Sequence, residues 1–592
     1  AGARVPIGVV VQPMALDEEE PDAIEVVEFG SAGIVRCKRC RTYMNPFVSW
    51  ADNGRRWRCN ICGLLNDTPT AYFSHLDGNG QRRDKDQRPE LSKCSVEFVA
   101  PGEYMVRPPQ PPVYVFAMDV SSSAMASGMI EVAAAAIKAS LDNLPSDDRT
   151  LVGFITFDSS VHFYNLKSTL SQPQMLVVSD VEDVLLPSPE DLLVNLQESR
   201  TVVDALLDAL PNMFQDQQVP DTCTGPALTA AQRLMSNIGG KLCLFQTGLP
   251  SVGEGALKPR ENPRLLGTDR EHTMLAVEDA WYKNKAIEFS RLQMCVELFV
   301  CTSTYADIAT LSVLPRYTAG TTYYLPGFYA PRDGPRLTAN ITRCLTRQTA
   351  FEAVMRVRCT RGLRIAHFYG NYFVRGTDLL ALPNCSPDSV FALDLVHEDP
   401  MLAASVVTIQ AALLYTSAHG ERRIRVHTMV LPVTSNPQDV LESADVDTVV
   451  NVLGKQAAEV AVKAGLDQAR SRLHQACVEA LRDRRGGGMP GYGAPSAGTG
   501  GVMTIPAALE LLPLYVMSLQ KHPALRGGND VRVDERAYYL HILGSMSMDE
   551  SRVFVYPRMF SIHDMTEDVG TPAAADDEVL TAGRGPLKLP PI

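Results

Sequence analysis

The sequence predicts a multidomain protein of the α/β plus β class, in which a zinc ribbon, an α/β trunk, a β-sandwich and an all-helical domain are joined. Three observations indicate this. Short apolar runs alternate with helical patterns over residues 113–345, apolar runs without helices between them fill residues 346–434, and two Cys-x-x-Cys pairs lie near the N-terminus. A chain of 592 residues is also too long for one hydrophobic core, so several domains are expected.

The trunk is predicted from strands that are apolar at every position, which is typical of a mostly parallel sheet buried on both faces. Such runs occupy residues 113–118, 151–157, 241–246 and 295–300. A helical stripe runs between the first two, at Ile130, Ala134, Ile137, Leu141 and Leu144. We therefore expect one α/β domain with helices on both sides of its sheet.

The parts around the trunk are predicted from changes of pattern. Strands separated by Gly, Pro, Asn and Asp predict the sandwich, and a long apolar stripe from Val462 to Leu481 at helical spacing predicts the helical domain. The expected boundaries are an N-terminal strand segment of the sandwich at 1–33, the zinc ribbon at 34–72, a connecting segment that is partly sandwich at 73–112, the trunk at 113–345, the β-sandwich at 346–434, the helical domain at 435–545 and a linker at 546–592.

Composition narrows the class of protein. With 45% hydrophobic and 21% charged residues, the chain has the make-up of an ordinary globular protein, and no apolar run reaches the about 18 residues of a membrane-spanning helix. The net charge of −13 argues against general binding of nucleic acid. Of 13 cysteines, those outside the paired motif are scattered, as expected for reduced thiols in the cytosol. Because the chain lacks an initiator Met, we expect it to be processed or a fragment.

The strongest motif is Cys-x2-Cys-x18-Cys-x2-Cys, formed by Cys37, Cys40, Cys59 and Cys62. Two turns of this kind bring four thiolates to one tetrahedral ion, and Zn²⁺ suits four sulfur ligands. Four cysteines close the coordination shell and leave no position for a catalytic water. One structural Zn²⁺ is therefore predicted.

Basic residues surround this motif, with Asp52 as the single acid from Arg36 up to Cys62. One interpretation is a solvated surface that favours thiolates. The other is an anion-binding face for an acidic peptide, a lipid surface or nucleic acid, since arginine presents a planar fork that matches carboxylate. The basic residues are Arg36, Lys38, Arg39, Arg41, Arg55, Arg56 and Arg58.

A second motif follows the first trunk strand. Asp119, Ser121 and Ser123 form Asp-x-Ser-x-Ser, the metal-ion-dependent adhesion pattern of von Willebrand factor A-type domains, and Thr224 resembles that site's second loop. The third loop should supply a carboxylate, but residues 246–248 are Gln-Thr-Gly. One carboxylate with hydroxyls holds a hard cation weakly, so we expect no functional Mg²⁺ or Mn²⁺, and hydroxyls that cap the following helix and turn.

No catalytic set stands out. The sequence has no G-x-S-x-G, no Walker A, no H-E-x-x-H and no G-x-G-x-x-G, so we expect no enzyme. Arg423, Arg425 and His427 alternate along one predicted strand face. They suggest either a second anion site or, with more weight, a solvated strand face.

Several stretches together closely resemble the cargo-adaptor subunit of the COPII vesicle coat, over nearly the whole chain. They include FGSAGIVRCKRCRTYMNPFV, RWRCNICGLLND, PPVYVFAMDVS, HGERRIRVHT and YPRMFSIHDM, in this order. The resemblance implies a zinc ribbon, a von Willebrand factor A-like trunk, a β-sandwich and a helical domain. It also implies a gelsolin-like domain, before which this chain is expected to stop.

The resemblance implies a non-enzymatic coat subunit that recognises export signals on cargo for transport from the endoplasmic reticulum (ER) to the Golgi. In that family, arginines flanking the ribbon cysteines bind acidic signals; Arg36 and Arg41 hold these places, and Arg358 and Arg361 are candidates for a further arginine. The implied partners are the GTPase-activating sibling subunit, the small GTPase of the coat, cytosolic tails of cargo and SNAREs, and an acidic membrane surface.

The implied location is cytosolic and peripheral, on ER exit sites and COPII vesicles. Two rival functions remain. A zinc-ribbon protein that binds nucleic acid would show salt-sensitive binding to any strand. A metal-dependent adhesion-type binder would need the carboxylate that the third loop lacks.

Overall fold

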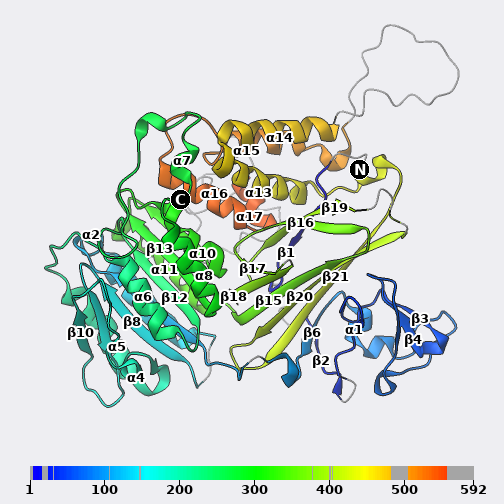
Figure 1. Ribbon diagram of the computed structural model, residues 1–592, viewed down its shortest axis with the longest axis horizontal. Coiled ribbons are helices and arrows are strands. Elements are labelled where there is room, and N and C mark those ends of the chain that lie inside the picture. The colour runs from blue at the N-terminus through cyan, green and yellow to red at the C-terminus, as the bar shows by residue number, and fades with distance from the viewer. Residues whose placement is uncertain are drawn as a thin grey trace, which may run out of the picture.

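The computed structural model describes residues 5–15, 24–30, 33–105, 107–145, 148–376, 378–398, 402, 404–481 and 505–555. Figure 1 shows the trunk on the left, the β-sandwich right of centre, the zinc ribbon at the lower right and the helices of the C-terminal half above. Among the described residues, no helix combines the length and apolar character needed to cross a membrane.

The trunk is built on one mostly parallel sheet. Strand β7 is its centre and is buried at every position, because helices cover both faces. Val113, Val115 and Ala117 belong to one core cluster, whereas Tyr114 and Phe116 belong to the other. The strands lie in the order β10 (Gln174–Val178), β9 (Val161–Asn165), β8 (Leu151–Phe157), β7 (Val113–Asp119), β12 (Gly240–Gln246), β13 (Met294–Thr302) and β14 (Thr322–Pro326), with β11 (Val194–Asn195) paired to β8.

Two sets of helices cover this sheet, as predicted from the buried strands. Helices α3, α5 and α11 share a core with the even-numbered side of β7, and α6 and α8 with the other side. The trunk helices are α2 (Ser122–Ser127), α3 (Met129–Ser140), α4 (Pro189–Leu192), α5 (Leu196–Met213), α6 (Thr224–Met235), α7 (His272–Leu275), α8 (Ala280–Arg291), α9 (Ile308–Leu311), α10 (Val313–Thr318) and α11 (Ala330–Thr346).

The sandwich consists of a large and a small sheet, and distant parts of the chain supply it. Strand β1 pairs with β19, with Val9 opposite Leu393, and β6 pairs with β21, with Phe98 opposite Ile424. The large sheet contains β17 (Phe373–Arg375), β18 (Leu379–Cys385), β15 (Ala350–Cys359), β20 (Val406–Thr416), β21 (Arg422–Pro432), β6 (Ser95–Val99) and β2 (Val26–Val27). The small sheet contains β1 (Gly8–Val11), β19 (Phe391–His397) and β16 (Leu363–Tyr369).

The ribbon is a small antiparallel sheet around a buried Trp57. It contains β3 (Ser49–Ala51), β4 (Arg56–Arg58) and β5 (Leu65–Asp67). The connecting segment contains the short helix α1 (Pro89–Ser92) and folds back on the ribbon. The buried Arg82 guanidinium lies over the rings of Trp50 and Tyr72, at 5.1 and 4.4 Å from their centroids, and so ties the two parts together.

The helical domain differs from the sequence prediction at two places. The stripe from Val462 to Leu481 is not one helix, because the chain breaks at Gly465, whose φ of +94° favours glycine. The helices are α12 (Pro437–Glu442), α13 (Val446–Ala464), α14 (Leu466–Leu481), α15 (Leu512–Lys521), α16 (Val533–Ser545) and α17 (Met548–Val555).

The second difference is α17, which lies in the segment 546–592 that we expected to be linker. Ser547 and Glu550 form a reciprocal capping box: the Ser547 amide donates to the Glu550 carboxylate at 2.8 Å, and the Glu550 amide donates to the Ser547 hydroxyl at 3.1 Å. Asn451 of α13 also donates to the Ser547 carbonyl at 3.0 Å. The remaining expected linker, residues 556–592, and the motif YPRMFSIHDM lie outside the described residues.

Candidate functional site

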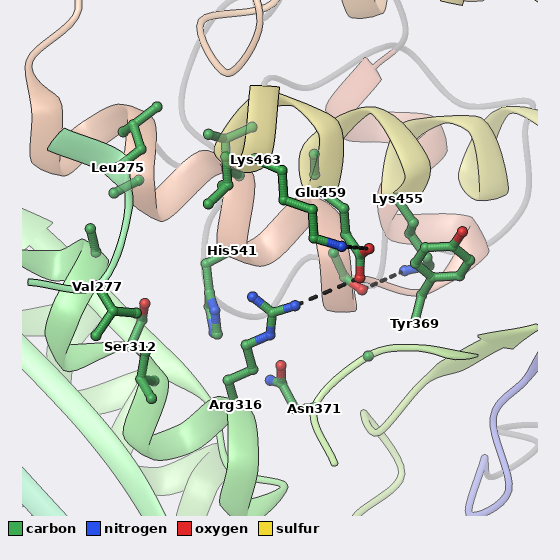
Figure 2. A pocket seen from close by; sticks show the side chains of 18 residues that line it. Leu275, Val277, Ser312, Arg316, Tyr369, Asn371, Lys455, Glu459, Lys463 and His541 are labelled. Carbon is green, nitrogen blue, oxygen red and sulfur yellow. Dashed lines mark hydrogen bonds and ion pairs between the residues drawn. The ribbon is translucent and has the colours of Figure 1, made fainter. Parts of the chain in front are cut away.

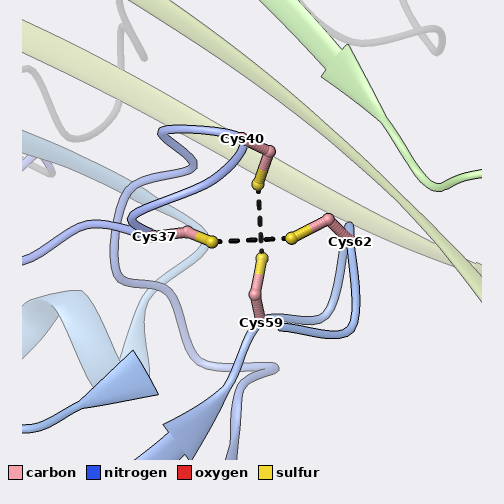
Figure 3. A group of neighbouring side chains, drawn as sticks. All are labelled: Cys37, Cys40, Cys59 and Cys62. Carbon is pink, nitrogen blue, oxygen red and sulfur yellow. Dashed lines mark hydrogen bonds between the residues drawn. The ribbon is translucent and has the colours of Figure 1, made fainter. Parts of the chain in front are cut away.

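The four motif cysteines converge on one point (Figure 3), and their sulfur atoms lie within 4.8 Å of one another. Two turns of matching geometry bring them together. The Arg41 amide donates to the Cys37 carbonyl at 3.0 Å in the first turn, and the Gly63 amide donates to the Cys59 carbonyl at 2.9 Å in the second. Four cysteines in this arrangement fit one tetrahedral Zn²⁺.

The surroundings of the sulfur atoms also fit a metal. Cys37 and Cys62 bring their sulfurs to 3.5 Å, and Cys40 and Cys59 do the same. Burial raises the pKa of the Cys62 thiol, so a cation is needed to hold thiolates this close together. The Asn66 side chain donates to the Cys37 sulfur at 3.6 Å, which orients a ligand from outside the coordination shell.

Both turns of the ribbon dock on the sandwich. The Tyr43 amide donates to the Gln410 side chain of β20 at 2.7 Å, and that side chain donates back to the Tyr43 carbonyl at 3.1 Å. The Arg358 Nε of β15 donates to the Cys40 carbonyl at 2.8 Å. At the second turn, the Arg361 amide donates to the Ile61 carbonyl at 3.2 Å. These hydrogen bonds fix the position of both metal-binding turns relative to β15 and β20.

Two of the four candidate arginines share one aromatic ring. The Cζ atoms of Arg36 and Arg358 lie 5.6 and 6.0 Å from the Tyr43 centroid, and Arg36 also lies 5.1 Å from the centroid of Tyr104. Arg36 Nη1 donates to the Tyr43 hydroxyl at 3.4 Å. Tyr43 was not among the residues predicted for the site, although its place two residues after Arg41 was a usable signal.

Arg358 carries a donor that nothing in the described part of the chain uses. Its Nη1 is buried and has no hydrogen-bond partner there. Burial lowers the pKa of the Arg358 guanidinium, and the nearby charges of Arg356 and Arg36 lower it further. A buried guanidinium donor beside like charges favours an added anion, because a missing partner costs about 1–3 kcal/mol.

The other two candidates occupy different positions. Arg41 directly follows Cys40, whose carbonyl accepts the Arg358 bond, and its side chain is exposed with a left-handed backbone of φ 61°. Arg361 is exposed beside the second turn, where Ile61 lies. The structure thus brings Arg36, Arg41 and Arg358 to the first turn and places Arg361 at the second.

The side chains of the Asp-x-Ser-x-Ser motif make hydrogen bonds to one another and to the third loop. The Asp119 carboxylate is buried and accepts from the Ser121 amide at 2.9 Å, the Thr247 amide at 3.0 Å and the Thr247 hydroxyl at 2.6 Å. Ser121 is the N-cap residue of α2 but makes no side-chain cap, and its hydroxyl instead lies 3.0 Å from that of Ser123. The interpretation of these hydroxyls as helix caps is therefore wrong, because the third loop supplies Thr247 as their partner.

The alternation of Arg423, Arg425 and His427 is neither a solvated face nor a free anion site. Arg425 is buried and pairs with Glu97 of β6 at 2.7 Å, and Arg423 pairs with the same carboxylate at 2.9 Å. The hydrogen bonds of His427 are 2.8 Å to the Ser95 hydroxyl and 3.0 Å to the Pro13 carbonyl. Both interpretations from the sequence are wrong, because β6 places a buried acid beside this strand.

Family models match four parts of the chain. These models are described as the Sec23/Sec24 zinc finger at residues 34–72, the Sec23/Sec24 trunk domain at 109–345, the Sec23/Sec24 beta-sandwich domain at 350–434 and the Sec23/Sec24 helical domain at 445–553. The crystal structure of the human COPII-coat protein Sec24c matches with a TM-score of 0.87 and 35% identity, covering 94% of this chain and 74% of that one.

The chain belongs to the Sec24 family. It is 47% identical to the protein transport protein SEC24 A of Arabidopsis thaliana over 97% of its length, and 42% identical to the human protein transport protein Sec24B over 96%. It spans 55% and 44% of those two proteins. The predicted fold class and the zinc site of the ribbon are confirmed by the family models and by the convergence of the four cysteines.

Proposed function

We propose that this chain is a non-enzymatic subunit of a COPII-type coat that recognises acidic export signals in the cytosolic tails of cargo proteins during ER-to-Golgi transport. The observation that carries the proposal is the Nη1 of Arg358, which has no partner in the described part of the chain and lies beside Arg36 and Arg41 at the first turn of the ribbon. An acidic peptide supplies the carboxylates that these arginines lack within the described residues.

The arrangement also explains why a chain of net charge −13 has a basic metal site. Zinc and the sandwich hold the first turn in place, so the arginines are oriented before a ligand arrives, and little ordering is required on binding. Arg358 has a second task, since its Nε holds the Cys40 carbonyl. Arg41, with an exposed side chain, is free of that structural task and contributes charge alone.

The finer features of the proposal come from the family. The chain would form a heterodimer with the GTPase-activating sibling subunit and contact the small GTPase of the coat and an acidic membrane surface. It would bind cargo and SNARE tails while peripheral at ER exit sites and on COPII vesicles. A pull-down from cytosol with the tagged chain should recover the sibling subunit, and its absence from the bound fraction under low salt would contradict this part.

Peptide affinity tests the site itself. Fluorescence anisotropy should show that a short acidic tail peptide binds the wild type more tightly than its alanine-substituted control does. Each charge-assisted contact is worth about 1.5–3 kcal/mol. Losing two of them in Arg36→Ala with Arg41→Ala should therefore weaken binding of the acidic peptide by about a hundredfold or more. Arg55→Ala, an exposed arginine elsewhere on the ribbon, is the matched control and should bind as the wild type does.

Retained zinc and an unchanged melting temperature would show that the double variant is folded. If that variant binds both peptides as the wild type does, the first turn is not the recognition site. If the wild type instead binds single-stranded and duplex nucleic acid with steep salt dependence, and the double variant loses this, the rival function of a nucleic-acid-binding zinc ribbon is favoured.

A further inference from the structure

A cleft of about 120 Å³ lies where the trunk, the sandwich and the helical domain meet. Its lining comes from α9 and α10 of the trunk, the turn after β16 of the sandwich, and α13 and α16 of the helical domain (Figure 2). In Figure 1 these elements lie well away from the zinc ribbon. No single domain forms the cleft, so its shape depends on how the domains pack together.

Much of the wall is aliphatic. Val313 from α10, Val462 from α13 and Leu540 from α16 line it together with Val277, which is 39% exposed although it is apolar. Pockets for drug-sized ligands have volumes of about 300–1,000 Å³. This cleft therefore suits a small aliphatic group rather than a large cofactor.

Basic groups outnumber acids around this wall. Glu459 is the only carboxylate among the lining residues. Its oxygens lie 3.1 Å from His367 Nε2 and 3.0 Å from Lys463 Nζ, and Arg316 is 3.7 Å away. Burial of Glu459 favours its neutral form, but the bonds from His367 and Lys463 outweigh this and lower the pKa of the carboxyl. The Glu459 carboxylate is thus ionised, and His367 and Lys463 already occupy it.

Arg316 has donors left over. Its contact with Glu459 is longer than a hydrogen bond, and among the described residues no other carboxylate lies within ion-pair distance of its guanidinium. Figure 2 shows this guanidinium reaching into the cleft between Glu459 and Asn371. Its side chain is 47% exposed, so a ligand from solvent can reach it.

A buried lysine also lines the cleft. Lys455 is fully buried, and its ammonium donates to the carbonyls of Met546 at 2.8 Å and Gly544 at 3.3 Å. Within the described residues no carboxylate pairs with it, and burial lowers its pKa to about 7. His541, which also lines the cleft, lies 3.2 Å from the Thr322 hydroxyl. With Arg316 and Lys463 against the carboxylate of Glu459, the polar lining favours a negative group over a positive one.

We propose that this cleft binds a small aliphatic monocarboxylate, with the carboxylate on Arg316 and the aliphatic group against Val313, Val462 and Leu540. The guanidinium fork matches a carboxylate, and the aliphatic wall disfavours a strongly hydrated anion without an apolar part. The site uses none of the ribbon arginines. It goes beyond the proposed function, and its test does not depend on cargo binding.

The probe is 4-methylpentanoate, titrated against the whole chain and followed by ligand-detected NMR. We expect saturable binding in about the millimolar range, as suits a ligand with few heavy atoms. The neutral 4-methylpentanamide and acetate should each bind about tenfold more weakly or not measurably, because one lacks the charge and the other the aliphatic group. Equal binding of the amide would overturn the role of Arg316 and with it the proposal.

Three variants locate the binding. Arg316→Gln should weaken 4-methylpentanoate about fivefold or more, and Val462→Phe should abolish binding, because the larger ring fills the cleft. Lys521→Gln removes an exposed cation of the helical domain that does not line the cleft, and it should bind as the wild type does. Unchanged affinity in both Arg316→Gln and Val462→Phe would place the ligand elsewhere and refute the site.

Discussion

Asp119→Ala should destabilise the trunk without changing its response to divalent cations. The substitution removes the acceptor of the Ser121 amide, the Thr247 amide and the Thr247 hydroxyl. The hydroxyl has another partner in Ser123, 3.1 Å away, but over the described ranges the two buried amides have no other acceptor to replace Asp119. Each buried donor left without an acceptor costs about 1–3 kcal/mol, which gives roughly 2–6 kcal/mol for the two.

Burial reduces this cost. It raises the pKa of Asp119, so the wild type already bears part of the penalty of a buried carboxylate. We therefore expect the free energy of unfolding to fall by about 2–4 kcal/mol, toward the lower end of that range. In a domain of this size, each kcal/mol lowers the melting temperature by about 2–4 °C. Asp216→Ala, an exposed residue of the same domain, is the control and should melt as the wild type does.

The assay is thermal unfolding with and without Mg²⁺ or Mn²⁺. Because Thr247 fills the position where the third loop would supply a carboxylate, the melting temperature of the wild type should not rise with either cation. A saturable rise at millimolar cation or below, lost in Asp119→Ala, would show that the motif holds a metal and that the hydrogen-bond network does not replace it.

Three further predictions concern the metal, a buried ion pair and a buried lysine. Elemental analysis should give one zinc per chain, and Cys59→Ser should lose it together with protection of the ribbon from hydrogen exchange; a metal-free ribbon that stays protected would contradict this, since structural zinc stabilises such folds by about 10 kcal/mol. In the wild type, the buried Arg536 lies 2.5 Å from Glu271. Glu271→Ala should lower the free energy of unfolding, measured in urea, by about 3–5 kcal/mol, because Arg536 is left without its charge partner. A loss below about 1 kcal/mol would refute the pairing. Between pH 7 and 9, the free energy of unfolding of the wild type should rise relative to that of Lys455→Met by at most about 1.4 kcal/mol per pH unit. The reason is that the Lys455 amine has a pKa of about 7 in the folded chain and of 10.5 in the unfolded chain. Parallel curves of unfolding free energy against pH for the two proteins would contradict the lowered pKa.

Local patterns predicted the elements whose causes are local. The apolar run at 113–118 became β7, since a strand covered on both faces needs no polar position. The spacing of Cys37, Cys40, Cys59 and Cys62 predicted their convergence, because each pair is set by its own tight turn. The capping box of Ser547 and Glu550 was equally local and could have been found, but the polar stretch after it suggested linker.

Features that depend on distant partners could not be predicted. Arg423 and Arg425 both pair with Glu97, and the pairing of β6 with β21 brings that acid beside them. Likewise, nothing near Arg358 in the sequence indicates that its Nε donates to the Cys40 carbonyl while its Nη1 has no partner among the residues that the structure describes. Pattern reasoning identified the arginines by type, and the docking of the ribbon on the sandwich set their positions.

A charge-swap cycle tests the central claim most directly. Affinities of the wild type and Arg41→Glu would be measured by anisotropy for an acidic peptide and for peptides in which single acids are replaced by lysine. If Arg41 contacts one acid of the peptide, Arg41→Glu should bind the peptide with lysine at that position more tightly than the two single losses added together predict. The coupling energy between the two changes should be about 1 kcal/mol or more. Strictly additive losses at every peptide acid, with zinc retained in both proteins, would contradict recognition of acidic signals at this turn.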